Sequence, residues 1–286
     1  MPVTTGRSQW FAWDYEPASG WKWAGGVNSG GPSDGFARRK RTWIGGRKKS
    51  VPGRTTLGGS VELDVTADSV PLMEIAVPTA GVLSTCKMSG YTGHRIWVHG
   101  GCYISEMTMT LAVDECLKAN LTWMSLPPYD TTAAPITEPS PVDDATFEDW
   151  AAYVTIDGVG TYEVQSAEVS VNNLAEYWNS IKARSVGELR GTDGIVYGAQ
   201  ECTADLEVLI PPDIDIVEDC PDSPASLIIE CGNPCSTSPG TLTITVPNLV
   251  WAPPAEEGYQ NSETGLVTWK CSLEQSPYAA CTIAYV

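Results

Sequence analysis

Two short motifs hold the residue types that nucleophilic or metal-dependent catalysis would need. "GPSDG" (31–35) has the letters of a G-x-S-x-G nucleophile elbow, which requires a strand before it and a helix after it. Here a glycine-rich stretch precedes the motif and "RRKR" follows it, so we expect no serine nucleophile. His94 and His99 flank "RIWV" in an expected strand, where an odd spacing places them on opposite faces.

The cysteines match no standard metal-binding pattern. Cys220, Cys231 and Cys235 lie in a segment rich in Pro, Ser and Gly, but no histidine is near and the spacing fits no zinc motif. Plain loop cysteines are favoured over a metal site. The 9 cysteines are an odd number and no secretory signal precedes them, so we expect mostly free thiols. The sequence predicts no catalytic residue, no metal and no cofactor.

The most distinctive spacing belongs to acidic and small polar residues that alternate with apolar ones, the period of a half-buried strand. None of these polar positions is Lys or Arg, although solvated faces of sheets usually mix charges that pair across strands. Nucleic acid binds through Lys and Arg with release of counterions, so this composition favours a surface past which nucleic acid slides without sticking. The positions are Glu62, Asp64, Glu106, Thr108, Thr110, Glu168, Ser170, Asp205 and Glu207.

The elements that would position these residues are almost all strands, from residue 60 onward. "GHRIWVHGGCYI" predicts a hairpin turning at Gly100-Gly101, and Asp157-Gly158 predicts another. The Pro-rich segment 127–145 is expected to be a long surface loop. One short helix is expected within 174–185, where Leu174, Tyr177 and Ile181 share a helical face.

An internal repeat appears when the sequence is shifted by sixty residues. "ISEMTMTLAV" (104–113) then aligns with "VQSAEVSVNN" (164–173). In each, an apolar residue is followed by two polar ones before the alternation resumes out of phase, which is the pattern of a β-bulge. We therefore expect two related halves, each with a bent strand that serves two surfaces.

Charge divides the chain into a basic arm and an acidic body. Residues 1–58 carry a net charge of +7, and the remainder carries −25. Five of the 11 tryptophans fall in the first 58 residues, where they suit anchors in a partner's grooves. The alternative is that the arm packs on its own domain. If the arm is an anchor, deletion of residues 1–50 should leave the β core folded.

The sequence shows no pattern of a secretory signal or a membrane span. Met1 is followed by no basic-then-apolar segment, and no apolar run approaches the roughly 18 residues of a membrane span. We expect a soluble protein that is synthesised in a cytoplasm.

Five stretches together resemble the tail tube proteins of long-tailed (siphovirus-like) viruses of bacteria and archaea, over roughly residues 45–270. They are "VPGRTTLGGSVELDV", "GGCYISEMTMTLAVDECLKANLTW", "FEDWAAYVTIDGVGTYEVQSAEVSVNNLAE", "YGAQECTADLEVLIPP" and "GTLTITVPNLVW". The order and spacing of the stretches carry the resemblance. The Trp-rich N-terminus and the "ECGNPCSTSPG" insert (230–240) depart from the family pattern.

The resemblance implies a mainly β protein, a β-sandwich or partial barrel with one flanking helix. It divides the chain into an arm (1–58) and a tube domain (59–286), with halves at 59–126 and 146–212, loop 127–145 and C-terminal strands 240–286. It also implies that six copies form rings, whose strands join an inner β-barrel, and that the rings stack into a virion tail tube for genome DNA. Tape-measure, terminator and baseplate proteins would be its partners, and DNA would pass without specific binding.

On this reading the nine polar positions face the lumen, and the arm and loop bridge subunits or rings. The bridging candidates are Trp10, Trp13, Trp21, Trp23, Arg38, Arg39, Lys40, Arg41, Trp43, Arg47, Lys48, Lys49, Arg54, Pro128 and Tyr129. Two alternatives remain: another ring-forming tail component, such as a terminator or baseplate hub, and a monomeric β-sandwich module that binds, for instance, carbohydrate.

Overall fold

The computed structural model describes residues 10–16, 20–33, 35–42, 48–78, 81–91, 96–125, 138–142, 144–156, 160–161, 163–178, 194–210, 225–251, 260–261, 267–275 and 279–286. Over these residues the fold is mainly β, as predicted, and every strand pairing is antiparallel. Alternating apolar residues account for this, since they form strands that bury one face.

The main sheet carries the long strands of both predicted halves. Its order is β3 (Gly26–Pro32), β5 (Lys48–Asp64), β8 (Lys118–Ser125), β7 (Ile96–Ala112), β11 (Glu163–Asn172), β14 (Glu201–Ile210) and β18 (Val267–Gln275). The two-residue strand β17 (Gln260–Asn261) also pairs with β18. β7 and β11, the two strands of the repeat, lie next to each other in the middle of this sheet.

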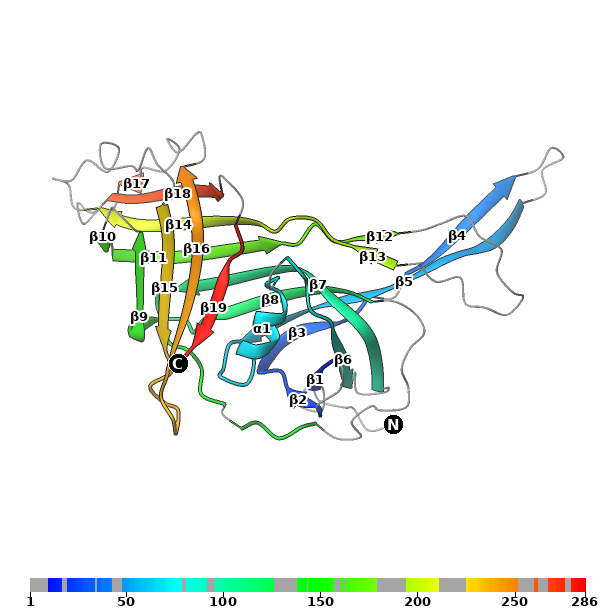
Figure 1. The fold of residues 1–286 in the computed structure, drawn as a ribbon, viewed down its shortest axis with the longest axis horizontal. Helices are drawn as coiled ribbons and strands as arrows, with labels where there is room; N and C mark the ends of the chain where they lie inside the picture. The colour runs from blue at the N-terminus through cyan, green and yellow to red at the C-terminus, as the bar shows by residue number, and fades with distance from the viewer. Residues whose placement is uncertain are drawn as a thin grey trace.

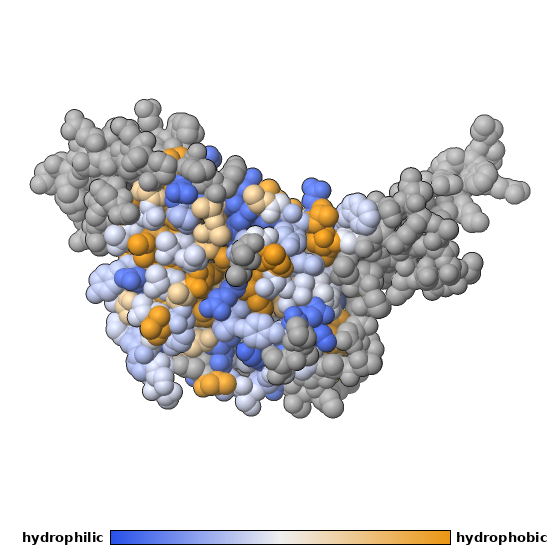
Figure 2. Space-filling model, viewed as in Figure 1, coloured by the Kyte–Doolittle hydropathy of each residue, from blue (hydrophilic) through white to orange (hydrophobic). Residues whose placement is uncertain are grey.

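A second layer crosses the long strands, as Figure 1 shows. It contains β9 (Ala152–Ile156), β15 (Ala225–Gly232), β16 (Thr241–Trp251) and β19 (Thr282–Tyr285), with the short β10 (Gly160–Thr161) paired to β9. The end of β16 also pairs with β18, which joins the layers. On the face that carries this layer, hydrophobic and hydrophilic residues are interspersed (Figure 2).

The core lies between these layers and under the one short α-helix of the described residues, α1 (Val70–Ile75). Met107, Met109 and Val169 of the main sheet are buried, and so are Ile229 and Ile244 of the second layer. A 3-10 turn, η2 (Asp149–Ala151), leads into β9. No helix within the described ranges is long and apolar enough to cross a membrane.

The N-terminal segment forms part of the fold. β1 (Trp10–Tyr15) pairs with β2 (Lys22–Trp23) and with β6 (Cys86–Tyr91), which in turn pairs with the first half of β7. Phe11 and Trp13 are buried in the core. The alternative that the arm packs on its own domain therefore holds for this stretch. Because Phe11 and Trp13 belong to this core, we now expect deletion of residues 1–50 to destabilise the β core.

Two predicted β-bulges are present at the expected positions. The register of β7 against β8 shifts between Ile104 and Glu106, so Ser105 is the extra residue. The register of β11 against β14 shifts between Val164 and Ser166, so Gln165 is the extra residue. Before its bulge β7 pairs with β6, and after it with β11, so the bulge separates two sets of strand partners.

Three local predictions need correction. Gly100-Gly101 is not a hairpin turn: β7 runs through it, and both glycines oppose Lys87 as a bulge in which Gly101 has φ +58°. The predicted helix at 174–185 begins instead as the strand β12 (Glu176–Trp178), which pairs with β13 (Gly194–Val196), and residues 179–185 lie outside the described ranges. The helix of the fold is α1, which the sequence pattern missed.

Two further predictions concern the second layer. Cys231 is buried in β15 and not in a loop, whereas Cys235 follows the strand and is exposed. The hairpin at Asp157-Gly158 is confirmed by the pairing of Gly160 with Ile156, although the turn itself lies outside the described residues.

Candidate functional site

All nine polar positions predicted from the alternation lie on one face of the main sheet. The strand registers place them in cross-strand rows, since residues directly opposite each other point to the same side. The first row is Ser29, Glu62, Asn120, Thr108, Ser170, Thr203 and Glu274, the second is Asp64, Lys118, Thr110, Glu168 and Asp205, and the third is Ser60, Thr122, Glu106, Asn172 and Glu201. Glu207 pairs with Ser166 and with Lys270 beyond them. We call these residues the polar face.

The opposite side of the same strands holds the sheet in this orientation. Met107, Met109 and Leu111 of β7 and Val169 and Val171 of β11 are all buried. A slip of one residue would exchange the two sets and expose the core, so the orientation is strongly fixed. Glu106, Glu168 and Asp205, by contrast, are exposed.

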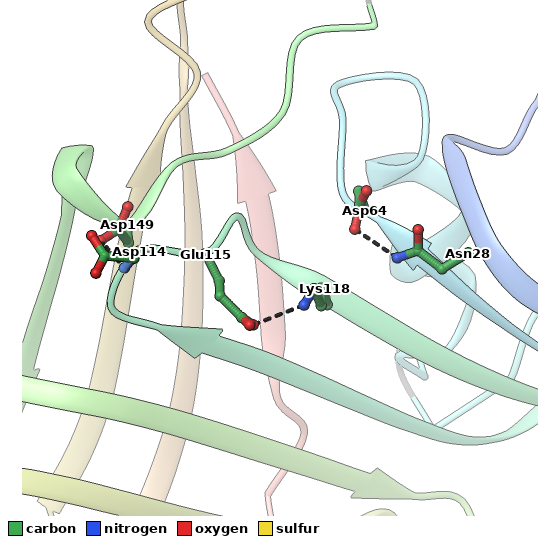
Figure 3. A network of polar contacts seen from close by, with 6 residues as sticks. All are labelled: Asn28, Asp64, Asp114, Glu115, Lys118 and Asp149. Atoms are coloured by element: carbon green, nitrogen blue, oxygen red, sulfur yellow. Dashed lines mark hydrogen bonds and ion pairs between the residues drawn. The ribbon is translucent and has the colours of Figure 1, made fainter.

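The centre of the polar face is neutral. Thr108 and Ser170 are cross-strand partners on β7 and β11, and their hydroxyl oxygens lie 3.2 Å apart, within hydrogen-bond distance. Carboxylates lie further out along the same row, where Ser29 donates to Glu62 at 3.0 Å. In the next row, Asn28 donates to Asp64 at 2.8 Å (Figure 3). These bonds orient the carboxylates without neutralising them.

The polar face includes two lysines that the sequence prediction did not include. Lys270 of β18 is the cross-strand partner of Glu207. Lys118 begins β8 opposite Thr110 and Asp64, so it shares their face. Its ammonium group lies 2.8 Å from Glu115 in an ion pair (Figure 3). This hydrogen bond raises the pKa of Lys118. The predicted absence of Lys and Arg holds for the nine positions but not for the whole face.

A pseudo-twofold axis relates the paired segments of β7 and β11. Met109 pairs with Val169, its equivalent in the sixty-residue repeat, so the axis passes through this pair. The bulges obey the same symmetry: Asn173 donates its backbone N–H to Ser105 at 2.9 Å, and Val113 donates to Gln165 at 3.1 Å. Each bulged carbonyl thus binds the end of the other half's strand.

The tryptophans proposed as bridging contacts have different surroundings. Trp13 is fully buried and makes an edge contact with Tyr15, so it belongs to the core of its own chain and is withdrawn as a contact candidate. Trp10 stacks on Tyr91, with ring centroids 6.5 Å apart, and Trp23 donates to Glu138 at 3.1 Å. Trp10, Trp21 and Trp23 are half-buried and keep some surface for a partner.

The basic candidates form one hairpin that extends away from the rest of the molecule (Figure 1). Its strands are β4 (Gly35–Thr42) and the first part of β5. β4 carries Arg38, Arg39, Lys40 and Arg41, and β5 carries Lys48, Lys49 and Arg54. Trp43, Arg47, Pro128 and Tyr129 lie outside the described residues. We call residues 35–56 the basic hairpin.

The residues considered for catalysis play structural roles where they are described. β4, not a helix, follows "GPSDG", so the elbow context is missing as predicted. His99 is buried, and its Nδ1 accepts a hydrogen bond from Trp123 at 3.1 Å. Burial raises the pKa of Cys231 to about 12, which leaves an unreactive thiol. Within the described residues no group of three or more His, Cys, Asp and Glu side chains could hold a metal ion.

Sequence reasoning also missed several neutral residues of the polar face. Asn120, Thr122 and Thr203 alternate with buried Leu121, Trp123 and Cys202, so the same period would have found them. Asn172, the cross-strand partner of Glu106, was also missed.

The sequence matches one family of known proteins. Residues 38–233 match the family described as "Phage tail tube protein". Among solved structures, a chain of the "Tail of empty GTA particle computed with helical refinement, C6 symmetry" is similar at 12% sequence identity and a TM-score of 0.38, covering 46% of this chain and 100% of that one. No curated protein matches.

Proposed function

The chain belongs to the phage tail tube protein family, a family of non-enzymatic structural components of the virion tail, and we propose that it is the major subunit of the tube. Six copies form a ring, the main sheets of neighbouring copies join into an inner barrel, and the rings stack into a hollow tube. Genome DNA passes through this tube, with the polar face lining it. Tape-measure, terminator and baseplate proteins are the proposed partners at its ends.

The polar face is the observation that carries the proposal. It is one continuous surface across the strands from β5 to β18, its centre is neutral and its flanks are acidic. Its two lysines each have a carboxylate neighbour: Lys118 pairs with Glu115, and Lys270 is the cross-strand partner of Glu207. A duplex binds proteins mainly through Lys and Arg contacts to phosphate, so this surface offers DNA few cations for binding. Weak repulsion from carboxylates keeps the duplex away from the wall.

The charge asymmetry supports stacking in one direction. A contact between the basic hairpin of one copy and the acidic body of the next uses two different surfaces. Such a heterologous contact does not close on itself, so it generates an open filament.

Electron microscopy of the purified chain tests the proposal. At high protein concentration we expect negatively stained hollow tubes or stacked rings, with sixfold symmetry in end-on averages and a matching fast component in sedimentation. A single ring that never stacks would favour a terminator instead. A monomer that stays monomeric even when mixed with a tail initiation complex would refute the proposal.

The lumen assignment has its own test. Thr108→Lys and Ser170→Lys place unpaired cations at the centre of the polar face, and Thr282→Lys makes the same kind of change on the exposed β19. Virions carrying the two central substitutions should assemble but eject DNA more slowly, whereas Thr282→Lys should behave like the unmodified protein. Equal ejection rates for all three would show that the polar face does not line the channel.

A further inference from the structure

A groove opens at the end of the main sheet that lies farthest from the basic hairpin. It has a volume of about 340 Å³ and lies between the end of β7, the start of β11 around the Gln165 bulge, and β9. Leu111, Val113, Val154 and Val164 give it apolar walls, and Asp149 and Tyr153 line its rim. In Figure 1 β9 and the start of β11 are at the left of the molecule, while β4 is at the far right.

One exposed aromatic side chain, Tyr153, lines the groove, and a second, Trp150, follows the groove residue Asp149 in the chain. Trp150, in η2, is 69% exposed, and Tyr153, in β9, is 67% exposed. Other large aromatic side chains of the fold, such as Trp13 and Trp123, are almost completely buried, so the exposure of Trp150 and Tyr153 stands out. Exposed Trp and Tyr beside a groove are the residue types that dominate binding at protein interfaces.

Carboxylates surround the same aromatic residues. Asp149 lines the groove and accepts a hydrogen bond at 2.9 Å from the backbone N–H of Asp114, whose own side chain is exposed (Figure 3). Glu230 is exposed and pairs directly opposite Tyr153 across β15 and β9. Faces of aromatic rings and carboxylates together suit Arg and Lys side chains, which bind both.

We propose that this groove is the acceptor for the basic hairpin of a second copy of the chain, an inference that rests on the proposed tube. The hairpin supplies the complementary charge: residues 35–56 contain eight basic residues and no acidic one. It also contains Phe36, Trp43 and Ile44, which are apolar residues of the kind that an apolar groove accepts.

Geometry makes the contact intermolecular. The hairpin and the groove lie at opposite ends of the long strands, so one chain cannot bring its own hairpin into its own groove (Figure 1). A second copy placed in line can, and the same contact then repeats along the axis. The groove therefore determines the direction of stacking as well as its strength.

The experiment is a charge exchange in the full-length chain. The groove variant is Asp149→Lys/Glu230→Lys, the hairpin variant is Lys48→Glu/Lys49→Glu, and a third protein carries all four substitutions. Glu74→Lys, an exposed position on α1, is the matched control. Because Asp149 binds the backbone of Asp114, Glu230→Lys alone is included as a variant that changes only an exposed residue. Native folding of each protein is verified by thermal unfolding.

Each double variant should raise the protein concentration needed for half-maximal stacking by about tenfold or more, the equivalent of about 1.4 kcal/mol of contact energy. The fourfold variant should recover most of the loss, and Glu74→Lys should stack normally. Carbodiimide treatment of tubes assembled from two isotopically distinct preparations should join Asp149 or Glu230 of one copy to a hairpin lysine of another.

The two proposals fail in different ways. If the unmodified chain forms no rings or tubes even when mixed with a tail initiation complex, the proposed function is refuted. If it forms tubes, but the groove variant stacks as well as Glu74→Lys, or the crosslinks join the hairpin to another surface, only the acceptor groove is refuted.

Discussion

Deletion of one bulge residue should damage the fold far more in one half of the repeat than in the other. Removing Ser105 forces the whole first part of β7, Ile96–Ile104, to shift by one residue against β8 and β6. Removing Gln165 shifts only the first residues of β11, Glu163 and Val164, against β14. The two bulges are equivalent by sequence and by symmetry, so the difference tests how much structure depends on each.

The expected magnitude follows from the side chains that would change faces. A shift at Ser105 would turn Trp97, Cys102 and Ile104 towards solvent, and these side chains are 5%, 0% and 0% exposed. Burial of one large apolar side chain contributes about 1.5–3 kcal/mol, so the loss is about 5 kcal/mol or more. That approaches the entire stability of many domains, which is about 5–15 kcal/mol. At Gln165 only the half-buried Val164 changes, and one backbone hydrogen bond from Val113 is lost, for about 1–2 kcal/mol.

Urea denaturation followed by circular dichroism measures both deletions against the unmodified chain. We expect the Gln165 deletion to fold with a slightly lower midpoint and the Ser105 deletion to be unfolded or close to it. Ser105→Ala is the control, because it keeps the extra residue and loses only the hydroxyl bond to the Thr122 carbonyl, for about 1 kcal/mol. Equal losses from the two deletions, or a Ser105 deletion that costs no more than Ser105→Ala, would refute the assignment of the bulge as the residue that fixes the register.

The remaining predictions concern single side chains. Trp13→Ala should lower the free energy of unfolding by about 3–5 kcal/mol, because it leaves a cavity at a fully buried site. Trp150→Ala, at an exposed site, should change the free energy of unfolding by less than about 0.5 kcal/mol. Thermal unfolding of the two variants measures the difference. Asn173→Ala should lower the free energy of unfolding by about 2 kcal/mol or more, as measured by urea titration. The side-chain amide of Asn173 donates to the carbonyls of Ala76 and Ile104, and the substitution removes this donor from both. Burial raises the pKa of Cys231 to about 12, so this thiol stays protonated in the folded protein, whereas in the unfolded chain it ionises near pH 9. The contribution of Cys231 to the free energy of unfolding is therefore fully present below about pH 9 and is lost as the pH rises towards 12. Alkylation of the native protein at pH 8 should accordingly modify the exposed Cys235 and spare Cys231, and equal labelling would contradict this burial.

The polar face and the bulges could be predicted from the sequence because both depend on the same strict period. In a strand every second side chain shares a face, so a change of phase at Ser105 or Gln165 can only mean an extra residue. The local sequence alone is enough to locate such an extra residue. Pairing of β7 with β11 was not predicted, although the repeat contained a hint of it: related strands can pair around a twofold axis.

The wrong predictions share a different cause. Leu174, Tyr177 and Ile181 have helical spacing, but Tyr177 donates its hydroxyl proton to the Leu57 carbonyl from β12, a tertiary contact that local spacing does not contain. The helix α1 has only six residues, too short for a periodic signal. Trp13 seemed suited to a partner because the arm has no sustained alternation, yet pairing of β1 with β6 buries it.

The pseudo-twofold symmetry explains why the polar face has its length. β7 and β11 pair over residues 106–112 and 166–172, and a bulge lies just before each run. The two strands are antiparallel, so the bulges are at opposite ends of the paired segment and bound it on both sides. Seven residues at about 3.4 Å each make a paired stretch about 24 Å long. Beyond either bulge the alternation of apolar and polar residues shifts by one position, so the apolar side chains no longer continue the same face of the strand. In the proposed tube, the bulges therefore set the height of wall that each copy contributes, and an insertion between them would lengthen the wall only if both halves were changed together.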